Sequence, residues 1–71
     1  MVTVKVVSKS TGNPQQSQRV VLSVFDGVTK SEYTDSKGEA HFNISPQNGE
    51  IIVNGRTVEK GRLEGKMVVY I

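Results

Sequence analysis

His41 is the only histidine of the 71-residue chain, and imidazole is the side chain best suited to proton transfer or metal binding near neutral pH. A histidine that acts as a general base needs an orienting carboxylate, and no neighbouring pattern supplies one. The chain also lacks the Glu-x-x-His and His-x-His spacings that favour metal binding. We therefore predict that His41 is an exposed strand residue. We predict no catalytic, metal-binding or cofactor-binding residue, and no enzyme activity.

The segment Thr34–Phe42, TDSKGEAHF, contains a second group of polar residues that could bind a ligand. It superficially resembles a calcium loop, but the alternate acidic or amide ligands are absent and Lys37 lies in the loop. Asp35 suits the first position of a type I turn, where its carboxylate accepts backbone hydrogen bonds, and Gly38 suits the last because it tolerates positive φ. We predict that Asp35 and Gly38 bend the chain into a hairpin with a bulge.

Cysteine content and charge exclude further classes of function. The chain has no cysteine, so it forms no disulfide and no zinc site with sulfur ligands. Nine Lys and Arg and seven Asp and Glu give a net charge of +2, and they are dispersed, which favours a solvated mixed surface.

Nucleic-acid binding is the alternative function, because small β-barrels that bind single strands combine a basic pI with short strands. Such proteins also need stacking aromatic residues on one exposed face. Only Phe25, Tyr33 and Tyr70 are expected to be free for stacking, since Phe42 is needed in the core. We therefore do not expect nucleic acid to be the partner.

Membrane insertion is not predicted. Apolar runs such as Met67–Ile71 fall far short of the roughly 20 residues that a membrane-spanning helix needs. The N-terminus has no basic region followed by an apolar block, so we predict no signal peptide. If the chain is a complete gene product, we expect a cytoplasmic protein.

Apolar and polar residues alternate with a period of two along most of the chain, which indicates half-buried β-strands and no helix. The expected strands are Val2–Val7, Arg19–Phe25, Thr29–Tyr33, Glu39–Ile44, Glu50–Val53, a strand after Asn54-Gly55, and Lys66–Ile71. The polar segment Thr29–Tyr33 is expected near a sheet edge. About seven short strands in so short a chain predict a small sandwich or barrel.

Turn-forming dipeptides separate these strands. Asp26-Gly27 is expected to end the second strand, and Ser45–Gly49 to form another turn. Lys60-Gly61 and Glu64-Gly65 are expected to interrupt the chain before the last strand.

The dipeptide Asn54-Gly55 lies between short apolar runs, which is a strong signal for a two-residue β-hairpin. The turn fixes the expected register. Val53 should pair with Arg56, and Ile51 with Val58.

The order and spacing of these motifs resemble a known family. The stretches VVSKSTGNPQQSQRVVLSVFDG and YTDSKGEAHFNISPQNGEIIV contain a Thr-Gly…Pro turn, a Val-x-Leu strand, Thr-Asp-x-x-Gly before an aromatic-bearing strand, and Pro-x-x-Gly before the next strand. The pattern is similar to the carboxypeptidase regulatory-like group of transthyretin-like β-sandwich domains. It covers Val4–Val53, departs from the family at Ser17-Gln18 and Ile51, and does not extend well over Arg56–Ile71. The resemblance implies an accessory or interaction module that is usually non-catalytic.

We therefore expect residues 1–71 to form one all-β domain, an immunoglobulin-like or transthyretin-like antiparallel sandwich. The expected core consists of Val4, Val6, Val20, Leu22, Val24, Ala40, Phe42, Ile44, Ile51, Val53 and alternate members of Met67–Ile71. The expected function is a non-enzymatic interaction or structural module. The expected partner is a protein or a second copy of the chain, held through an edge strand.

Overall fold

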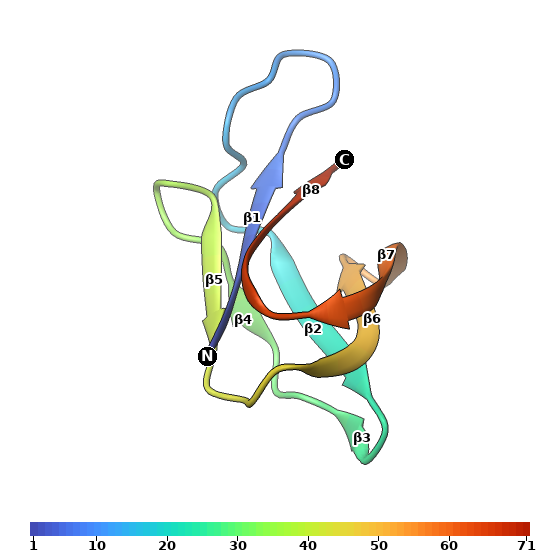
Figure 1. The fold of residues 1–71 in the computed structure, drawn as a ribbon. Coiled ribbons are helices and arrows are strands. Elements are labelled where there is room, and N and C mark those ends of the chain that lie inside the picture. Colours follow the sequence, from blue (N-terminus) through green and yellow to red (C-terminus); the bar gives the residue numbers. More distant parts are fainter.

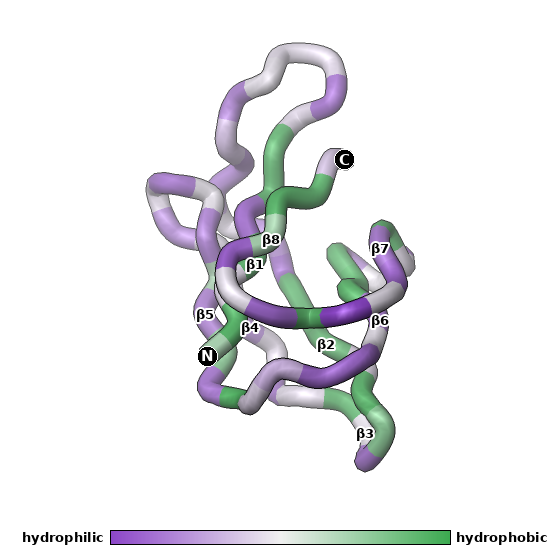
Figure 2. The backbone as a smooth tube through the Cα atoms, viewed as in Figure 1, coloured by the Kyte–Doolittle hydropathy of each residue, from purple (hydrophilic) through white to green (hydrophobic).

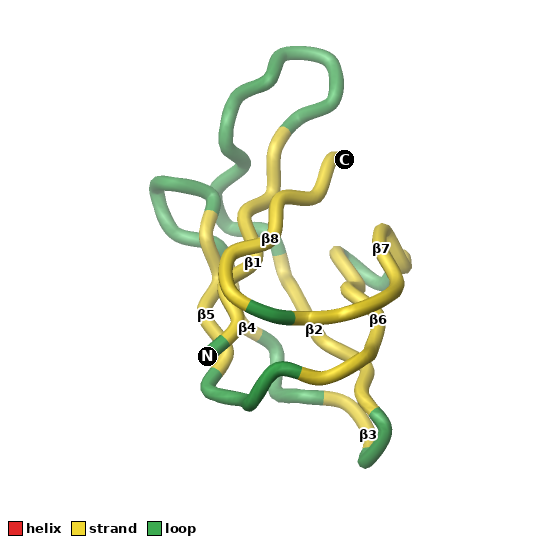
Figure 3. Tube along the Cα trace, in the orientation of Figure 1, coloured by secondary structure: helices red, strands yellow, loops and turns green.

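The alternating sequence forms eight β-strands and no helix in the computed structural model, which describes residues 1–71 (Figure 3). The strands are β1 (Val2–Val7), β2 (Arg19–Val24), β3 (Gly27–Val28), β4 (Glu32–Tyr33), β5 (Glu39–Phe42), β6 (Gln47–Val53), β7 (Arg56–Leu63) and β8 (Gly65–Tyr70). The predicted all-β class is confirmed. No helix is present that is long and apolar enough to cross a membrane.

Two sheets pack together as a small β-sandwich (Figure 1). Sheet A has the strand order β5-β1-β8, and sheet B has the order β3-β2-β6-β7, with β4 also paired to β2. β1 is antiparallel to β5 but parallel to β8, so the expectation of a purely antiparallel sandwich is wrong at this ladder. Parallel neighbours require a crossover instead of a hairpin. Here most of the chain, including all of sheet B, lies between the two paired strands.

The core lies between the two sheets and consists mainly of aliphatic side chains. Figure 2 shows hydrophobic residues concentrated in β1, β2 and the later part of β8. The core residues are Val2, Val4, Val6, Val20, Leu22, Ala40, Phe42, Ile51, Val53, Leu63 and Val69. Most of the predicted core is therefore confirmed, although Val24, Ile44 and Met67 are only partly buried and Ile71 is 41% exposed.

The region after β2 differs from the predicted strands. β2 ends at Val24, and Phe25 and Asp26 form the turn, one residue earlier than expected. Gly27 pairs with Val24 at a φ of 130°, a conformation that favours glycine. Of the predicted strand Thr29–Tyr33, only Glu32 and Tyr33 form a strand, β4, and a second short strand, β3, precedes it at Gly27–Val28; both pair with β2. Both lie along one edge of sheet B, as the polar composition predicted.

The hairpin of β6 and β7 is longer than predicted, because Gly49 and Gly61 lie within its strands and not in turns. β6 begins at Gln47, inside the predicted turn Ser45–Gly49, and β7 continues through Gly61 to Leu63. Gly49 lies opposite Gly61, and a Cβ atom at Gly49 would collide with the carbonyl oxygen of Ser23 on β2. Gly49 therefore allows close approach of neighbouring backbones and does not end a strand.

The register around Asn54-Gly55 is partly as predicted. Val53 pairs with Arg56, but Ile51 pairs with Glu59 and not with Val58. A bulge between Ile51 and Ile52 shifts the register by one residue. The hairpin signal was correct because it is local, while the bulge is an irregularity that the alternation did not reveal.

Candidate functional site

The turn after β4 has the local geometry that its sequence predicted. The Gly38 amide donates to the Asp35 carbonyl and the Asp35 amide donates to the Glu39 carbonyl, each at 2.9 Å, with Gly38 at a φ of 76°. Asp35 Oδ1 accepts hydrogen bonds from the amides of Lys37 (2.9 Å) and Glu39 (3.0 Å). The predicted hairpin is nevertheless wrong, because β4 pairs in sheet B and β5 in sheet A. The turn carries the chain from one sheet to the other.

A buried threonine fixes the start of this turn. The Thr34 hydroxyl donates to the Gln15 carbonyl at 2.6 Å and accepts from the Gln18 amide at 2.8 Å. Only 4% of Thr34 is exposed, so both bonds are shielded from water. The turn is thereby attached to the long loop that precedes β2.

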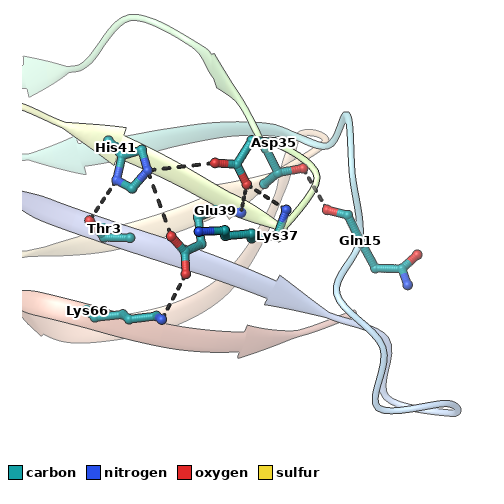
Figure 4. A network of polar contacts seen from close by, with 8 residues as sticks. Thr3, Gln15, Asp35, Lys37, Glu39, His41 and Lys66 are labelled. Carbon is teal, nitrogen blue, oxygen red and sulfur yellow. Dashed lines mark hydrogen bonds and ion pairs between the residues drawn. The ribbon is translucent and has the colours of Figure 1, made fainter.

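His41 lies on the outer face of sheet A, as predicted, but it is not isolated from carboxylates. Its Nε2 atom is 3.9 Å from Asp35 Oδ2 and 3.9 Å from Glu39 Oε1 (Figure 4). A hydrogen bond of 2.9 Å joins its Nδ1 atom to Thr3 Oγ1 on the neighbouring β1. The turn folds Asp35 back over β5, so the structure brings two carboxylates near His41 that the spacing of residues in the sequence did not indicate.

Glu39 connects this group to β8. Its Oε2 atom is 2.8 Å from the Lys66 ammonium, and only 15% of its side chain is exposed. Glu39 and His41 are two residues apart on β5, so both side chains point to the same face of the sheet. We call Asp35, Glu39 and His41 the polar triad; one donor atom from each lies within 4.8 Å of the others.

Both carboxylates of the polar triad favour the ionised form. The backbone amides of Glu39 and Lys37 hold the pKa of Asp35 below its ordinary value. The hydrogen bond from Lys66 holds the pKa of Glu39 below its ordinary value. Both groups therefore remain negative at neutral pH and attract cations.

These pKa shifts predict that the protein loses stability in acid. A carboxylate with a lowered pKa in the folded state stabilises the protein above its unfolded pKa, which is 3.8 for Asp and 4.5 for Glu. We expect the free energy of unfolding to fall as the pH drops below about 4.5. Urea unfolding over a pH series should show a smaller acid-induced fall in the free energy of unfolding for Asp35→Asn and Glu39→Gln than for the parent chain. Glu59→Gln, at an exposed position on β7, is the control. If this variant reduced the acid-induced loss of stability as much as Asp35→Asn or Glu39→Gln does, the loss could not be assigned to those two carboxylates.

A groove of about 490 Å³ lies on another part of the surface, where the end of β8 approaches the turn between β6 and β7. Val53, Val58 and Tyr70 provide apolar surface, and Lys9 and Arg56 provide positive charge. Neither cation takes part in any of the four ion pairs of the structure. The groove therefore combines apolar surface with two unpaired cations.

β8 forms one edge of sheet A and pairs only with β1. Val69 points into the core, whereas Val68 and Tyr70 are 46% and 54% exposed. The sequence predicted that Lys66–Ile71 would be open to pairing if it lay at an edge. That condition is met by β8.

The three aromatic residues expected to be free are exposed: Phe25, Tyr33 and Tyr70. Phe25 lies in the turn beside β3, and Tyr70 lies at the end of β8; Figure 1 shows β3 at one end of the molecule, well apart from the end of β8. Phe25 and Tyr70 therefore do not form one platform for stacked bases.

The sequence and the structure were compared with known proteins. No family model matches the chain, and neither the curated proteins nor the solved structures contain a match.

Proposed function

We propose that this chain is a non-enzymatic interaction module that adds a strand from a second copy of itself along β8. The observation that carries the proposal is the open edge of β8, with the exposed side chains of Val68 and Tyr70. An edge strand presents unpaired backbone donors and acceptors, and a second strand satisfies them. The resemblance to carboxypeptidase regulatory-like domains supports the same class of function.

The side chains of β8 are self-complementary in one register. If two copies of β8 pair antiparallel with Val68 opposite Val68, Lys66 of each copy lies opposite Tyr70 of the other. Apolar and cation–aromatic cross-strand pairs both stabilise a sheet. This register also keeps the two Lys66 ammonium groups apart. The resulting dimer has a two-fold axis, and its two copies of sheet A become one continuous sheet.

Sedimentation velocity over a wide range of protein concentrations tests this proposal. We expect a reversible monomer–dimer equilibrium that Val68→Lys shifts to monomer, because a lysine at the centre of the pairing places two charges opposite each other. Val28→Lys is the matched control, since Val28 is an exposed valine on the edge of sheet B. A monomer at every concentration, or a dimer that only Val28→Lys dissociates, would exclude pairing through β8.

A further inference from the structure

Each side chain of the polar triad has one polar atom that contacts a group other than the three triad side chains. Thr3 holds Nδ1 of His41, Lys66 holds Oε2 of Glu39, and backbone amides hold Oδ1 of Asp35. The remaining atoms, Nε2, Oε1 and Oδ2, point toward one another in Figure 4. Each side chain is thus anchored through one polar atom and leaves a second polar atom available to bind a metal ion, and these three atoms lie within 4.8 Å of one another.

We propose that the polar triad binds a divalent first-row transition metal ion, for which Zn²⁺ is the probe. The donor set is one imidazole nitrogen and two carboxylate oxygens, which suits zinc and its neighbours better than Ca²⁺ or Mg²⁺, whose ligands are oxygen atoms. Three protein ligands leave a fourth position of a tetrahedral ion for water. The exposure of the His41 and Asp35 side chains, 49% and 48%, leaves this position accessible.

The distances fit such an ion after a small adjustment. Zinc bonds of about 2.0–2.2 Å in a tetrahedral site place the ligand atoms about 3.3–3.6 Å apart. His41 Nε2 is 3.9 Å from each carboxylate oxygen and the three ligand atoms lie within 4.8 Å of one another, so movements of roughly 1 Å bring them into range. Exposed side chains make such movements without disturbing the core, because Asp35 lies in the turn and His41 on the outer face of sheet A.

The surrounding contacts favour coordination through one oxygen of each carboxylate. When Nδ1 of His41 carries the proton and donates it to Thr3 Oγ1, Nε2 presents its lone pair to the metal. Lys66 contacts Oε2 of Glu39 and leaves Oε1 free, so the ammonium and the metal bind different oxygens. Such outer contacts orient metal ligands and raise the affinity of the site. Lys66 also repels the metal, so we expect weaker binding than at a structural site with four ligands.

Titration of the untagged protein with Zn²⁺, followed by nuclear magnetic resonance of the His41 ring and the backbone amides, tests the proposal. We expect saturation at one ion per chain, with shifts centred on Asp35, Glu39 and His41. His41→Ala should abolish this binding. Thr3→Val should weaken it by about 10- to 100-fold, because the valine keeps the shape of the strand residue but loses the hydrogen bond to Nδ1.

Glu64→Gln is the matched control, because Glu64 is also paired with a cation, Arg62, but lies outside the polar triad. We expect unchanged zinc affinity in this variant. The proposal is overturned if zinc causes no saturable shift at His41, if His41→Ala binds as tightly as the parent chain, or if Glu64→Gln reduces the affinity as much as Glu39→Gln does. The amide spectrum of each variant shows directly whether it is folded, so loss of folding is distinguishable from loss of binding.

Discussion

Replacing Phe42 with alanine is expected to lower the free energy of unfolding by about 3–5 kcal/mol. Phe42 is 4% exposed, and it lies on β5 opposite Val2 of β1, in the core between the two sheets. The truncation removes a large apolar side chain and leaves a cavity that neighbouring strands fill only in part. Because a domain of this length has a total stability on the order of a few kcal/mol, we expect most of the variant to be unfolded.

His41→Ala is the matched control, since His41 precedes Phe42 on the same strand and points to the opposite face. We expect this variant to change the stability by less than about 0.5 kcal/mol, because an exposed side chain contributes little. Urea unfolding of both variants, followed by circular dichroism, provides the comparison. A larger loss of stability for His41→Ala than for Phe42→Ala would mean that the two faces of β5 are exchanged, and the assignment of its core residues would then be wrong.

Gly38→Ala is expected to destabilise the protein by about 2–4 kcal/mol, because strain and collision act together. Gly38 has a φ of +76°, which residues with a Cβ atom rarely adopt. A Cβ atom there would lie 2.8 Å from the carbonyl oxygen of Val6 and 2.9 Å from Cβ of Pro14. The Val6 carbonyl belongs to the backbone of β1, so it can move away only if sheet A is distorted.

Gly12→Ala separates the two causes. Gly12 has nearly the same φ, +78°, but a Cβ atom there meets nothing within 4 Å. We therefore expect only the strain, about 1–2 kcal/mol. Lys37→Ala, in the same turn as Gly38, should have almost no effect. If chemical denaturation gives equal losses for Gly12→Ala and Gly38→Ala, the close approach of the turn to β1 is not present in solution.

The local parts of the fold were predictable from the sequence. Alternation located the core faces of β1, β2 and β5, and turn chemistry identified the bends at Asp35–Gly38 and Asn54-Gly55. The assignment of strands to sheets was not predictable, because it depends on pairing between distant residues. Leu63 was missed as a core residue for a related reason, because it is a single apolar residue in the polar stretch from Lys60 to Lys66. It is buried because β7 continues as far as Leu63.

The polar triad was predictable in part. The alternation on β5 placed Glu39 and His41 on one face, so the sequence contained a signal for a carboxylate beside the histidine. Spacing rules that search for Glu-x-x-His do not detect it, because they describe a helix and not a strand. The position of Asp35 required the three-dimensional structure, since it depends on how the turn folds back over β5.

The parallel ladder between the first and last strands determines how the protein responds to mechanical force. Val2 pairs with Gly65 and Val7 pairs with Tyr70, so the two chain ends leave the ladder at opposite ends. A pull on both ends therefore slides β1 and β8 along each other and loads all of their hydrogen bonds at once. An antiparallel pair pulled from one end would open one bond at a time. If the domain is linked at both ends to larger structures, this ladder has to break before the rest of the chain can be extended.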